Sequence, residues 1–492
     1  MKFDANVRKD LPRLAWSAMV QEGSVKVEHG VDVEVGDGWV VEGVWDAPFE
    51  GGQFDRSAGF WGSGLTVRGD SVTVVPSIAL CDRLLMMREG AGWRVSNSLP
   101  LLLGRSLVSL DENTDYRLAA YAIARGVVEY DKVVPVSGGR EVLQVFHRIA
   151  KIEAGGVSFH DRPPAPKHTD FASYLRRIRG VVERLQENFE APSRTKRVRA
   201  VATASSGYDS ACTAVFAKAA GAALCATSSD SNRTRVAKLL SPGESDSGGP
   251  VASALGLAIH DLPALPSNRE IRFRSASCTR PELAFDGLYG LFENEVGAVF
   301  TGFYGDTIWG IPEKGSVDSE LRWHEPSGVS LSEARLHAGY INLALPFLDG
   351  RSRPYVVEVS KSEEMNVYRI GGDYDRPIPR RILEEAGVPR EAFGRRKRAI
   401  LNLDDIPANP SSREDFLAWL DERGRVSSSE YLRRLRLSSA SFYANGFFDK
   451  VVSGLGGRPR YTKRDSWWTE ECHPQNLMFL WANDRLAAGY RE

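Results

Sequence analysis

The sequence predicts an α/β protein of two domains, the first mostly β and the second built on a parallel sheet. The chain of 492 residues is longer than one hydrophobic core usually organises, and its composition, 42% hydrophobic and 26% charged, is ordinary for a globular protein. Short β-type runs separated by turn residues fill the chain from Val25 to about Ile152. Beyond the first domain, strand-like and helix-like segments alternate, which is the pattern of parallel strands joined by crossover helices.

Three runs represent the β-type pattern of the first domain: "VKVEHGVDVEVGDGWVVEGVW", "GFWGSGLTVRGDSVTVVP" and "GWRVSNSLPLLL". They are followed by "FHDRPPAPKHTD" (159–170), which holds three prolines and few apolar residues, as linkers do. We therefore predict a boundary near residue 165, with one domain over 1–165 and a second over 166–492.

A long amphipathic helix is expected to open the second domain. Its apolar residues recur at helical spacing behind a Thr169/Asp170 cap. Next come a buried strand in "VRAVATA", a helix over roughly 210–220 and a strand in "ALCATSS"; "LAIHDLP" and "GAVFTG" are further strand candidates. The apolar positions of the first helix are Phe171, Tyr174, Leu175, Ile178, Val182, Leu185 and Phe189.

Charge and cysteine content exclude several classes of protein. The 63 basic and 64 acidic side chains give a net charge of −1, so no overall field favours nucleic acid or an anionic membrane as a partner. The five cysteines are scattered without a C-x-x-C pair, which fits neither a disulfide framework nor a thiolate metal site. No apolar run approaches the roughly 18 residues of a membrane span. These features predict a soluble, cytoplasmic protein.

The stretch "VATASSGYDSACTAV" (201–215) places small polar residues between a strand and a helix. A glycine-containing turn at that junction offers backbone N–H groups and the positive end of a helix to an anion. A carboxylate, Asp209, beside phosphates is tolerable only when a divalent cation bridges them. The stretch therefore favours phosphate with Mg²⁺, although a turn with an ordinary helix cap explains the same residues.

This stretch resembles the S-G-G-x-D-S signature of the PP-loop ATP pyrophosphatases, with Ser206 where that pattern usually begins its glycine pair. Three later segments resemble, in order, the synthetase domain of the glutamine-dependent asparagine synthetases and their amide-forming relatives, β-lactam synthetase and the lasso-peptide cyclases. These segments are "TGFYGDTIWG", "LPFLDGRS" and "RRILEEAGVPREAFGRRKRA". Four such segments in order make coincidence improbable.

The resemblance implies a doubly wound parallel-sheet synthetase domain that uses ATP and Mg²⁺. In the family, a substrate carboxylate attacks the α-phosphorus of ATP, pyrophosphate leaves, and an amine then displaces AMP to form an amide. Asp209 and Asp306 are expected to hold the metal, and Lys397 matches the catalytic lysine. The substrates would be small-molecule or peptide carboxylates and amines. The residues that the resemblance assigns to the nucleotide are Ser205, Ser206, Gly207, Asp209, Ser210, Thr227 and Gly305.

A local basic patch accompanies Lys397. The residues from 376 to 398 include eight basic side chains against three acidic ones, which suits phosphate in an otherwise balanced chain. Nucleic-acid binding is the alternative, but aromatic residues to stack bases are scarce there. The basic residues are Arg376, Arg380, Arg381, Arg390, Arg395, Arg396, Lys397 and Arg398, and the acidic ones are Glu384, Glu385 and Glu391.

The first domain resembles the family's glutaminase, an Ntn-type αββα sandwich, through "VSNSLPLLL" and "GVVEYDKVVPVSGGREVLQV". A working glutaminase uses an N-terminal cysteine as its nucleophile and the α-amine as base. Residue 2 is Lys2 and the first cysteine is Cys81. We therefore predict that this domain hydrolyses no glutamine and serves as a scaffold and substrate lid.

The sequence does not single out one residue as the general base. Many relatives read Glu-x-Arg before "PFLD", where this chain has Asn342 and Ala344, and β-lactam-forming relatives carry a tyrosine at the position of Phe303. Tyr304, one residue later, is the nearest candidate. The alternatives are a carboxylate or histidine (Glu325, His324, His337) or an amine that arrives already neutral.

Two rival functions remain at this stage. One is a PP-loop enzyme that activates a carbonyl for sulfur or nitrogen insertion, for which Cys212 and Cys225 are the nearest thiols. The other is a non-catalytic module that binds a nucleotide or a partner with a decayed site. The sequence names neither the carboxylate nor the amine, and it leaves the oligomeric state open, a homodimer included.

Overall fold

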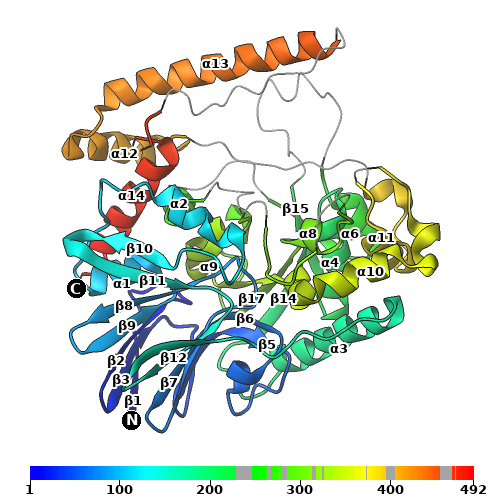
Figure 1. Cartoon of the computed structure of the whole chain (residues 1–492), viewed down its shortest axis with the longest axis horizontal. Coiled ribbons are helices and arrows are strands. Elements are labelled where there is room, and N and C mark those ends of the chain that lie inside the picture. The colour runs from blue at the N-terminus through cyan, green and yellow to red at the C-terminus, as the bar shows by residue number, and fades with distance from the viewer. Residues whose placement is uncertain are drawn as a thin grey trace.

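The computed structural model describes residues 1–228, 246–262, 268–279, 285–312, 317–323, 326–372, 374–394, 405–454, 468–470 and 472–491, with side chains for all of these except 268–270, 286 and 442–454. The described chain is a mixed α/β protein with three sheets, of seven, six and five strands (Figure 1).

Two largely antiparallel sheets form the first part of the chain and lie face to face (Figure 1). In the seven-stranded sheet the order is β1 (Lys2–Val7), β3 (Ser24–His29), β2 (Trp16–Gln21), β9 (Gly92–Ser96), β8 (Leu84–Glu89), β11 (Arg140–Val145) and β10 (Val133–Val136). In the six-stranded sheet it is β13 (Gly156–His160), β12 (Ile149–Glu153), β7 (Ser71–Val75), β6 (Phe60–Arg68), β5 (Trp39–Trp45) and β4 (Glu34–Gly36).

The core between these two sheets follows from alternation along the strands. In β3, Val25 and Val27 are buried while Lys26 between them is exposed, as the two-residue period of a half-buried strand requires. Leu65 and Val74 of the six-stranded sheet belong to the same buried cluster. The two sheets therefore bury one apolar face each against the other.

One segment predicted as a β-type run is partly helical. "GWRVSNSLPLLL" supplies strand β9, but its second half forms α1 (Leu99–Arg105). Ser98 caps the helix by accepting a hydrogen bond from Leu101 N at 3.3 Å, and Pro100 stands in the first turn, where its missing N–H costs nothing. Six of the seven residues of α1 are buried, so its apolar run reflects a buried helix rather than a strand.

The helix expected to open the second domain is confirmed as α3 (Phe171–Phe189), and all seven predicted apolar positions are buried. Asp170 accepts a hydrogen bond from Ser173 N at 2.6 Å, and the Ser173 hydroxyl accepts one from Asp170 N at 3.2 Å. This reciprocal pair fixes the start of the helix. Residues 161–170, between β13 and α3, contain neither helix nor strand.

The five-stranded sheet is parallel throughout and has the order β16 (Ala258–Asp261), β15 (Leu224–Thr227), β14 (Val198–Thr203), β17 (Val296–Thr301) and β18 (Tyr340–Ala344). All four strands proposed from the sequence, β14 to β17, are present. Strands β15 and β16 lie on one side of β14, and β17 and β18 lie on the other. The connection that follows β14 and the connection that follows β17 therefore leave the carboxyl ends of these two adjacent strands in opposite directions. Ligands of open parallel sheets bind at this switch point.

Both faces of the parallel sheet are covered. Ala200 and Ala202 of β14 pack in the cluster that includes α4 (Tyr208–Ala219), while Val201 faces a second cluster with Leu288 and Phe292. Burial on both sides explains why the strand reads as a continuous apolar run. The other helices of this region are α6 (Gly249–Ala254), α7 (Asn268–Ser275), α8 (Gly305–Ile308), α9 (Ser332–Ala338), α10 (Arg353–Lys361) and α11 (Pro377–Glu385).

The last helices return to the first part of the chain. After α12 (Pro410–Arg423) and the long α13 (Ser428–Gly454), α14 (Pro474–Ala488) packs on α1 and close to α2 (Tyr116–Tyr121) (Figure 1). Asn476 of α14 accepts a hydrogen bond from Tyr116 N at 3.0 Å. A side chain at Gly104 of α1 would lie 2.7 Å from the carbonyl oxygen of Ala487, so the two helices touch through backbone.

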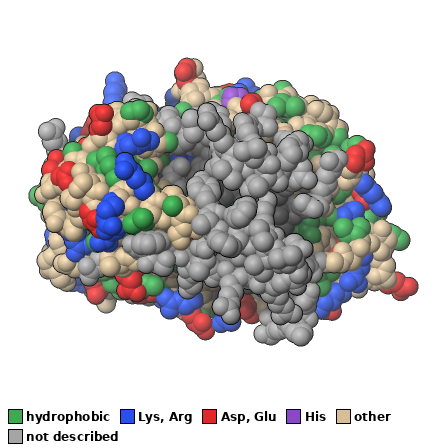
Figure 2. Space-filling model, turned by 90° about the horizontal axis from the view of Figure 1, so that it is seen from above, with side chains coloured by type: hydrophobic (Ala, Val, Ile, Leu, Met, Phe, Trp, Pro, Cys, Tyr) green, Lys and Arg blue, Asp and Glu red, His purple; other side chains and the backbone are tan. Residues whose placement is uncertain are grey.

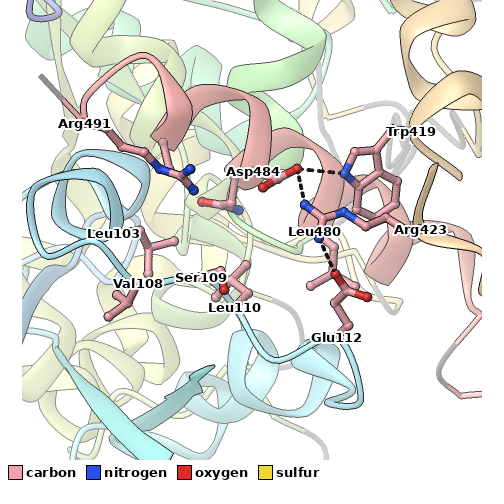
Figure 3. Close-up of a pocket in the computed structure, with 12 residues that line it drawn as sticks. Leu103, Val108, Ser109, Leu110, Glu112, Trp419, Arg423, Leu480, Asp484 and Arg491 are labelled. Carbon is pink, nitrogen blue, oxygen red and sulfur yellow. Dashed lines mark hydrogen bonds and ion pairs between the residues drawn. The ribbon is translucent and has the colours of Figure 1, made fainter. Parts of the chain in front are cut away.

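A small cavity marks this contact (Figure 3). Trp419 and Arg423 of α12 both bind Asp484 of α14, at 2.9 and 2.7 Å, and Arg423 also binds Glu112 of the first part at 2.8 Å. The cavity volume of about 30 Å³ holds only a few water molecules. The cavity therefore belongs to a packed seam between helices.

A buried ionic network joins the two parts of the chain. Arg335 of α9 donates to both carboxylate oxygens of Glu42 in β5, at 2.7 and 2.8 Å, and to Asp82 at 2.5 Å. Ser63 donates a further hydrogen bond to Glu42 at 2.7 Å, and all of these side chains are buried. Since an unpaired charge is costly in such a place, the network fixes the two parts against each other.

The described residues of one face carry charges of both signs (Figure 2). Basic and acidic side chains of the described residues are interspersed on the face seen in Figure 2. Among the helices of the described residues, none has the length and apolar content needed to span a bilayer.

Candidate functional site

The turn after β14 brings together five of the residues predicted to bind a nucleotide: Ser205, Ser206, Gly207, Asp209 and Ser210. Gly207 stands at the N-cap of α4, with Asp209 in the first turn. Ser205 N donates to the Ser210 hydroxyl at 3.0 Å, and Gly207 N donates to the Ser205 hydroxyl at 3.2 Å. The serines therefore shape the turn, which lies at the switch point of the sheet and leads into the N-terminus of α4.

The turn after β17 lies directly against this first turn. A side chain at Gly302 would lie 2.4 Å from Ser210 N, and one at Gly305 would lie 2.6 Å from the Asp209 Cβ. Two glycines thus permit a close approach that larger residues would prevent. Asp306 follows Gly305 at the start of α8, so the two acidic residues predicted to bind metal lie on adjoining turns.

A buried arginine pairs with the first of these acidic residues. Arg376, only 5% exposed, forms an ion pair with Asp209 and lies 4.9 Å from the ring of Tyr374. Burial disfavours the charge on Arg376, but attraction to Asp209 and Asp306 outweighs burial and raises the pKa of its guanidinium. The arrangement keeps a positive charge beside the two carboxylates.

The residues present suit a magnesium ion that arrives with a nucleotide. Among the described residues, no group of three or more His, Cys, Asp or Glu side chains is placed to hold a metal. Asp209 and Asp306 supply two carboxylates, and Mg²⁺ in proteins commonly takes one or two carboxylates together with substrate phosphates and water. The donor set therefore fits a divalent cation that completes its coordination with water or phosphate.

The remaining predicted ligand, Thr227, ends strand β15 at the same edge of the sheet. Its hydroxyl accepts a hydrogen bond from Gly248 N at 2.8 Å, which ties the turn before α6 to the strand. Asp246, in that same segment, accepts a hydrogen bond from the Ser206 hydroxyl. Burial raises the pKa of the Asp246 carboxyl, and the bonds from Ser206 oppose the shift. Sequence reasoning missed Asp246, since no motif marks it.

Tyr304, the predicted base, is buried among aromatic rings. It stacks on Phe347 at 4.5 Å and meets Trp323 edge-on at 5.7 Å. Its φ of 72° lies in the left-handed region, which is uncommon for a residue other than glycine. Burial raises the pKa of its phenol, so the neutral form is favoured. Asn342, where relatives have glutamate, accepts a hydrogen bond from Thr301 at 2.7 Å and is fully buried.

The basic run divides into two groups. Arg376 and Arg380 turn toward α4, where Arg380 donates to the Tyr208 hydroxyl. Arg381 binds Glu364 and Glu385 at 2.9 and 2.8 Å, and Arg390 binds Glu384 at 2.7 Å, as in ordinary surface pairs. Lys397, Arg395, Arg396 and Arg398 lie outside the described residues, as do His324 and Glu325.

His337 and the two cysteines near the turn occupy other environments. His337 lies on α9, which precedes β18 and so stands at the amino end of the strands, and it stacks on Phe273 at 3.4 Å. Cys212 and Cys225 are fully buried. Burial raises the pKa of both thiols, that of Cys225 to about 12, which disfavours the reactive thiolate.

Comparison of the sequence with models of known protein families finds no matching family, and comparison with curated protein sequences finds no match. The interpretation of the site therefore depends on its own geometry. That geometry is a small-residue turn at the switch point of a parallel sheet, two adjoining acidic residues and a buried arginine beside them.

Proposed function

We propose that the protein is an ATP-dependent carbon–nitrogen ligase of the asparagine synthetase-like class. A substrate carboxylate oxygen attacks the α-phosphorus of ATP, the bond from that phosphorus to the bridging oxygen of the pyrophosphate breaks, and an acyl-adenylate and pyrophosphate result. A neutral amine then attacks the acyl carbon, the C–O bond to AMP breaks, and the amine proton passes to a base. The products are an amide, AMP and pyrophosphate.

The observation that supports this proposal most is the contact between the two turns. Gly305 lies so close to Asp209 that a methyl group would overlap its Cβ, which sets Asp209 and Asp306 on adjoining turns at the carboxyl edge of the sheet. The turn of residues 205–210 leads into the N-terminus of α4 at the same edge. A small-residue turn for phosphate and two carboxylates for its counter-ion therefore lie together at one edge of the sheet, as binding of a metal nucleotide requires.

In this proposal Asp209 and Asp306 hold Mg²⁺, which, when bound, neutralises charge on the leaving pyrophosphate. The turn serines and Gly207 position the triphosphate, and Gly305 allows the approach of the second turn. Lys397 would stabilise the oxyanion that forms when the amine attacks. Tyr304 is a poor base in its apolar surroundings unless the turn moves, which favours an amine that arrives neutral or a base outside the described residues.

The fold that accompanies this function would be an Ntn-type αββα sandwich joined to a PP-loop synthetase domain. The two face-to-face sheets and the parallel sheet built outward from β14 are compatible with that architecture. The Met1 amino group donates a hydrogen bond to the carbonyl of Gly69 at 2.9 Å, and residue 2 is Lys2. The first domain would act as a scaffold in a cytoplasmic enzyme that takes small-molecule or peptide substrates and no glutamine.

Sulfur insertion is the less favoured alternative. Such chemistry needs an accessible thiolate that can form a persulfide. Cys212 and Cys225 near the turn are buried, with thiol pKa values raised by burial. The two nearest thiols are therefore unsuited to the reaction.

Pyrophosphate release tests the proposal. Purified protein with MgATP is assayed against a panel of carboxylates and amines, and release is expected with a productive pair. Asp306→Asn should abolish release, whereas Asp421→Asn, an exposed residue of α12, should leave it unchanged. Nucleotide binding without release over the whole panel would favour the non-catalytic module. Glutamate formation from glutamine would contradict an inert first domain.

Lys397 tests the amide-forming step separately. Preorganised charge stabilisers of this kind are typically worth about 10² to 10³ in rate, so Lys397→Ala should lower turnover by that factor while calorimetry still detects ATP binding. Lys397→Arg should not restore the rate, since a planar guanidinium differs in shape from a compact ammonium. Near-normal turnover of Lys397→Ala would show that another cation of the basic run carries the role.

A further inference from the structure

The turn at the candidate site has all four of its first backbone donors satisfied by protein. Ser205 N binds the Ser210 hydroxyl at 3.0 Å, Ser206 N binds the Asp246 carbonyl at 3.2 Å, and Gly207 N binds the Ser205 hydroxyl at 3.2 Å. Tyr208 N, at the start of α4, lies 3.4 Å from the Tyr374 hydroxyl. The protein itself thus provides acceptors where a phosphate would otherwise provide them.

The same segment that supplies Tyr374 also supplies a cation. Arg376 is the N-cap residue of α11, is 5% exposed, and pairs with Asp209, whose side chain is 25% exposed. The charge of Asp306 on the adjoining turn also attracts this guanidinium and contributes to raising its pKa. The positive charge therefore pairs with one of the two carboxylates that the proposed function gives to magnesium and is attracted by the other.

We propose that Arg376 is the resident counter-ion of Asp209 in the ligand-free protein and that it gives up this place to a divalent cation. This inference rests on the proposed nucleotide site and adds to it a competition between two cations. One carboxylate oxygen cannot accept the guanidinium and bind a metal with the same lone pair, and two cations at such short range repel each other. The ion pair keeps Asp209 from being left half-buried and uncompensated before the metal arrives.

Manganese binding tests the competition without any substrate. Mn²⁺ is added to the full-length protein in the absence of nucleotide, and the EPR signal of the free ion measures binding. Arg376→Gln should bind Mn²⁺ at least about fivefold more tightly than the wild type. Arg376→Lys keeps the positive charge and should stay close to the wild type. Arg381→Gln, a matched change on the same helix whose partners are Glu364 and Glu385, should also leave the affinity unchanged.

The double variant Arg376→Gln/Asp209→Asn should lose the gain, because the metal needs the carboxylate that the arginine released. An unchanged or weaker affinity in Arg376→Gln, a gain that survives Asp209→Asn, or no Mn²⁺ binding by any variant would overturn the inference. Arg376→Met, which keeps the apolar stem, replaces the glutamine variant if that one does not fold. The experiment needs no carboxylate, amine or ATP, so its outcome is independent of whether pyrophosphate is released.

Discussion

Two buried arginines beside pairs of carboxylates have opposite characters in this protein. Arg335 makes three hydrogen bonds of 2.5 to 2.8 Å to Glu42 and Asp82, whose side chains are 0% and 3% exposed. Arg376 pairs with Asp209, whose side chain is 25% exposed at the edge of a turn. A guanidinium whose three nitrogens all donate to buried carboxylates locks two parts of the fold together, whereas one paired with a partly exposed carboxylate can exchange its partner.

The largest effect is expected at Arg335. Arg335→Gln leaves Glu42 and Asp82 buried without their cation, and removing one partner of a buried pair typically costs about 3–5 kcal/mol. Urea unfolding followed by tryptophan fluorescence should show this loss in the free energy of unfolding. A loss below about 1 kcal/mol would mean that this ionic network does not stabilise the contact between the two parts of the chain as its geometry indicates.

The second effect is a pH dependence of the free energy of unfolding, which arises from Glu333 on the same helix as Arg335. Burial raises the pKa of the Glu333 carboxyl from 4.5 to about 7, against opposition from the Ser98 hydroxyl at 2.6 Å and from Arg335 and Arg83. The folded state binds the proton more tightly than the unfolded state, so this stabilisation is complete below pH 4.5 and is lost as the pH rises through 7. The loss should reach about 3 kcal/mol at most.

Unfolding by urea at a series of pH values from 5 to 8 measures that slope. Glu333→Gln keeps the shape and accepts the Ser98 hydrogen bond, so it should flatten the dependence. If the slope is the same in both proteins, another group titrates over this range.

The third effect concerns the contact between the two turns at the candidate site. Gly305→Ala places a methyl group 2.6 Å from the Asp209 Cβ, so one of the two turns must shift. We expect about a tenfold or larger loss of MgATP affinity by calorimetry, with a loss in stability of about 1–3 kcal/mol. Gly155→Ala has no neighbour within 4 Å of its added methyl, and Gly155, like Gly305, has no positive φ, so it serves as the control for a glycine-to-alanine change without a close contact. Equal losses of affinity in both variants would contradict a specific contact between the turns.

The smallest effect is expected at Arg381. Its pairs with Glu364 and Glu385 are partly exposed, and such pairs contribute about 0–1 kcal/mol. Arg381→Gln should therefore change urea unfolding little. A large loss there would remove the contrast between buried and exposed pairs on which the first prediction depends.

Local patterns carried the prediction of the parallel-sheet region. The buried strand β14, the turn at 205–210 and the capped helix α3 each follow from neighbouring residues, and all three are present. The half of "GWRVSNSLPLLL" that becomes α1 was wrongly taken as a β-type run, because short apolar runs look alike in buried strands and buried helices.

The partners at the site could not be predicted in the same way. Asp246 meets Ser206 from 40 residues away, and Arg376 meets Asp209 from 167 residues away. Arg376 appeared in the sequence as one of eight basic residues suited to phosphate, and its pairing with Asp209 is set by the packing of α11 on α4. Contacts of this kind depend on tertiary packing, which one sequence without its fold does not specify.

The return of α14 to α1 has a consequence for the order in which the protein forms during synthesis. The hydrogen bond from Tyr116 N to Asn476 can form only after Asn476 has been synthesised, 360 residues later in the chain. At a synthesis rate of about 5–20 residues per second, the outer apolar face of α1 stays uncovered for roughly 20–70 seconds. The first part of the chain therefore cannot complete its folding while it is being synthesised. During that interval its uncovered apolar surface is available to holding chaperones in the cell.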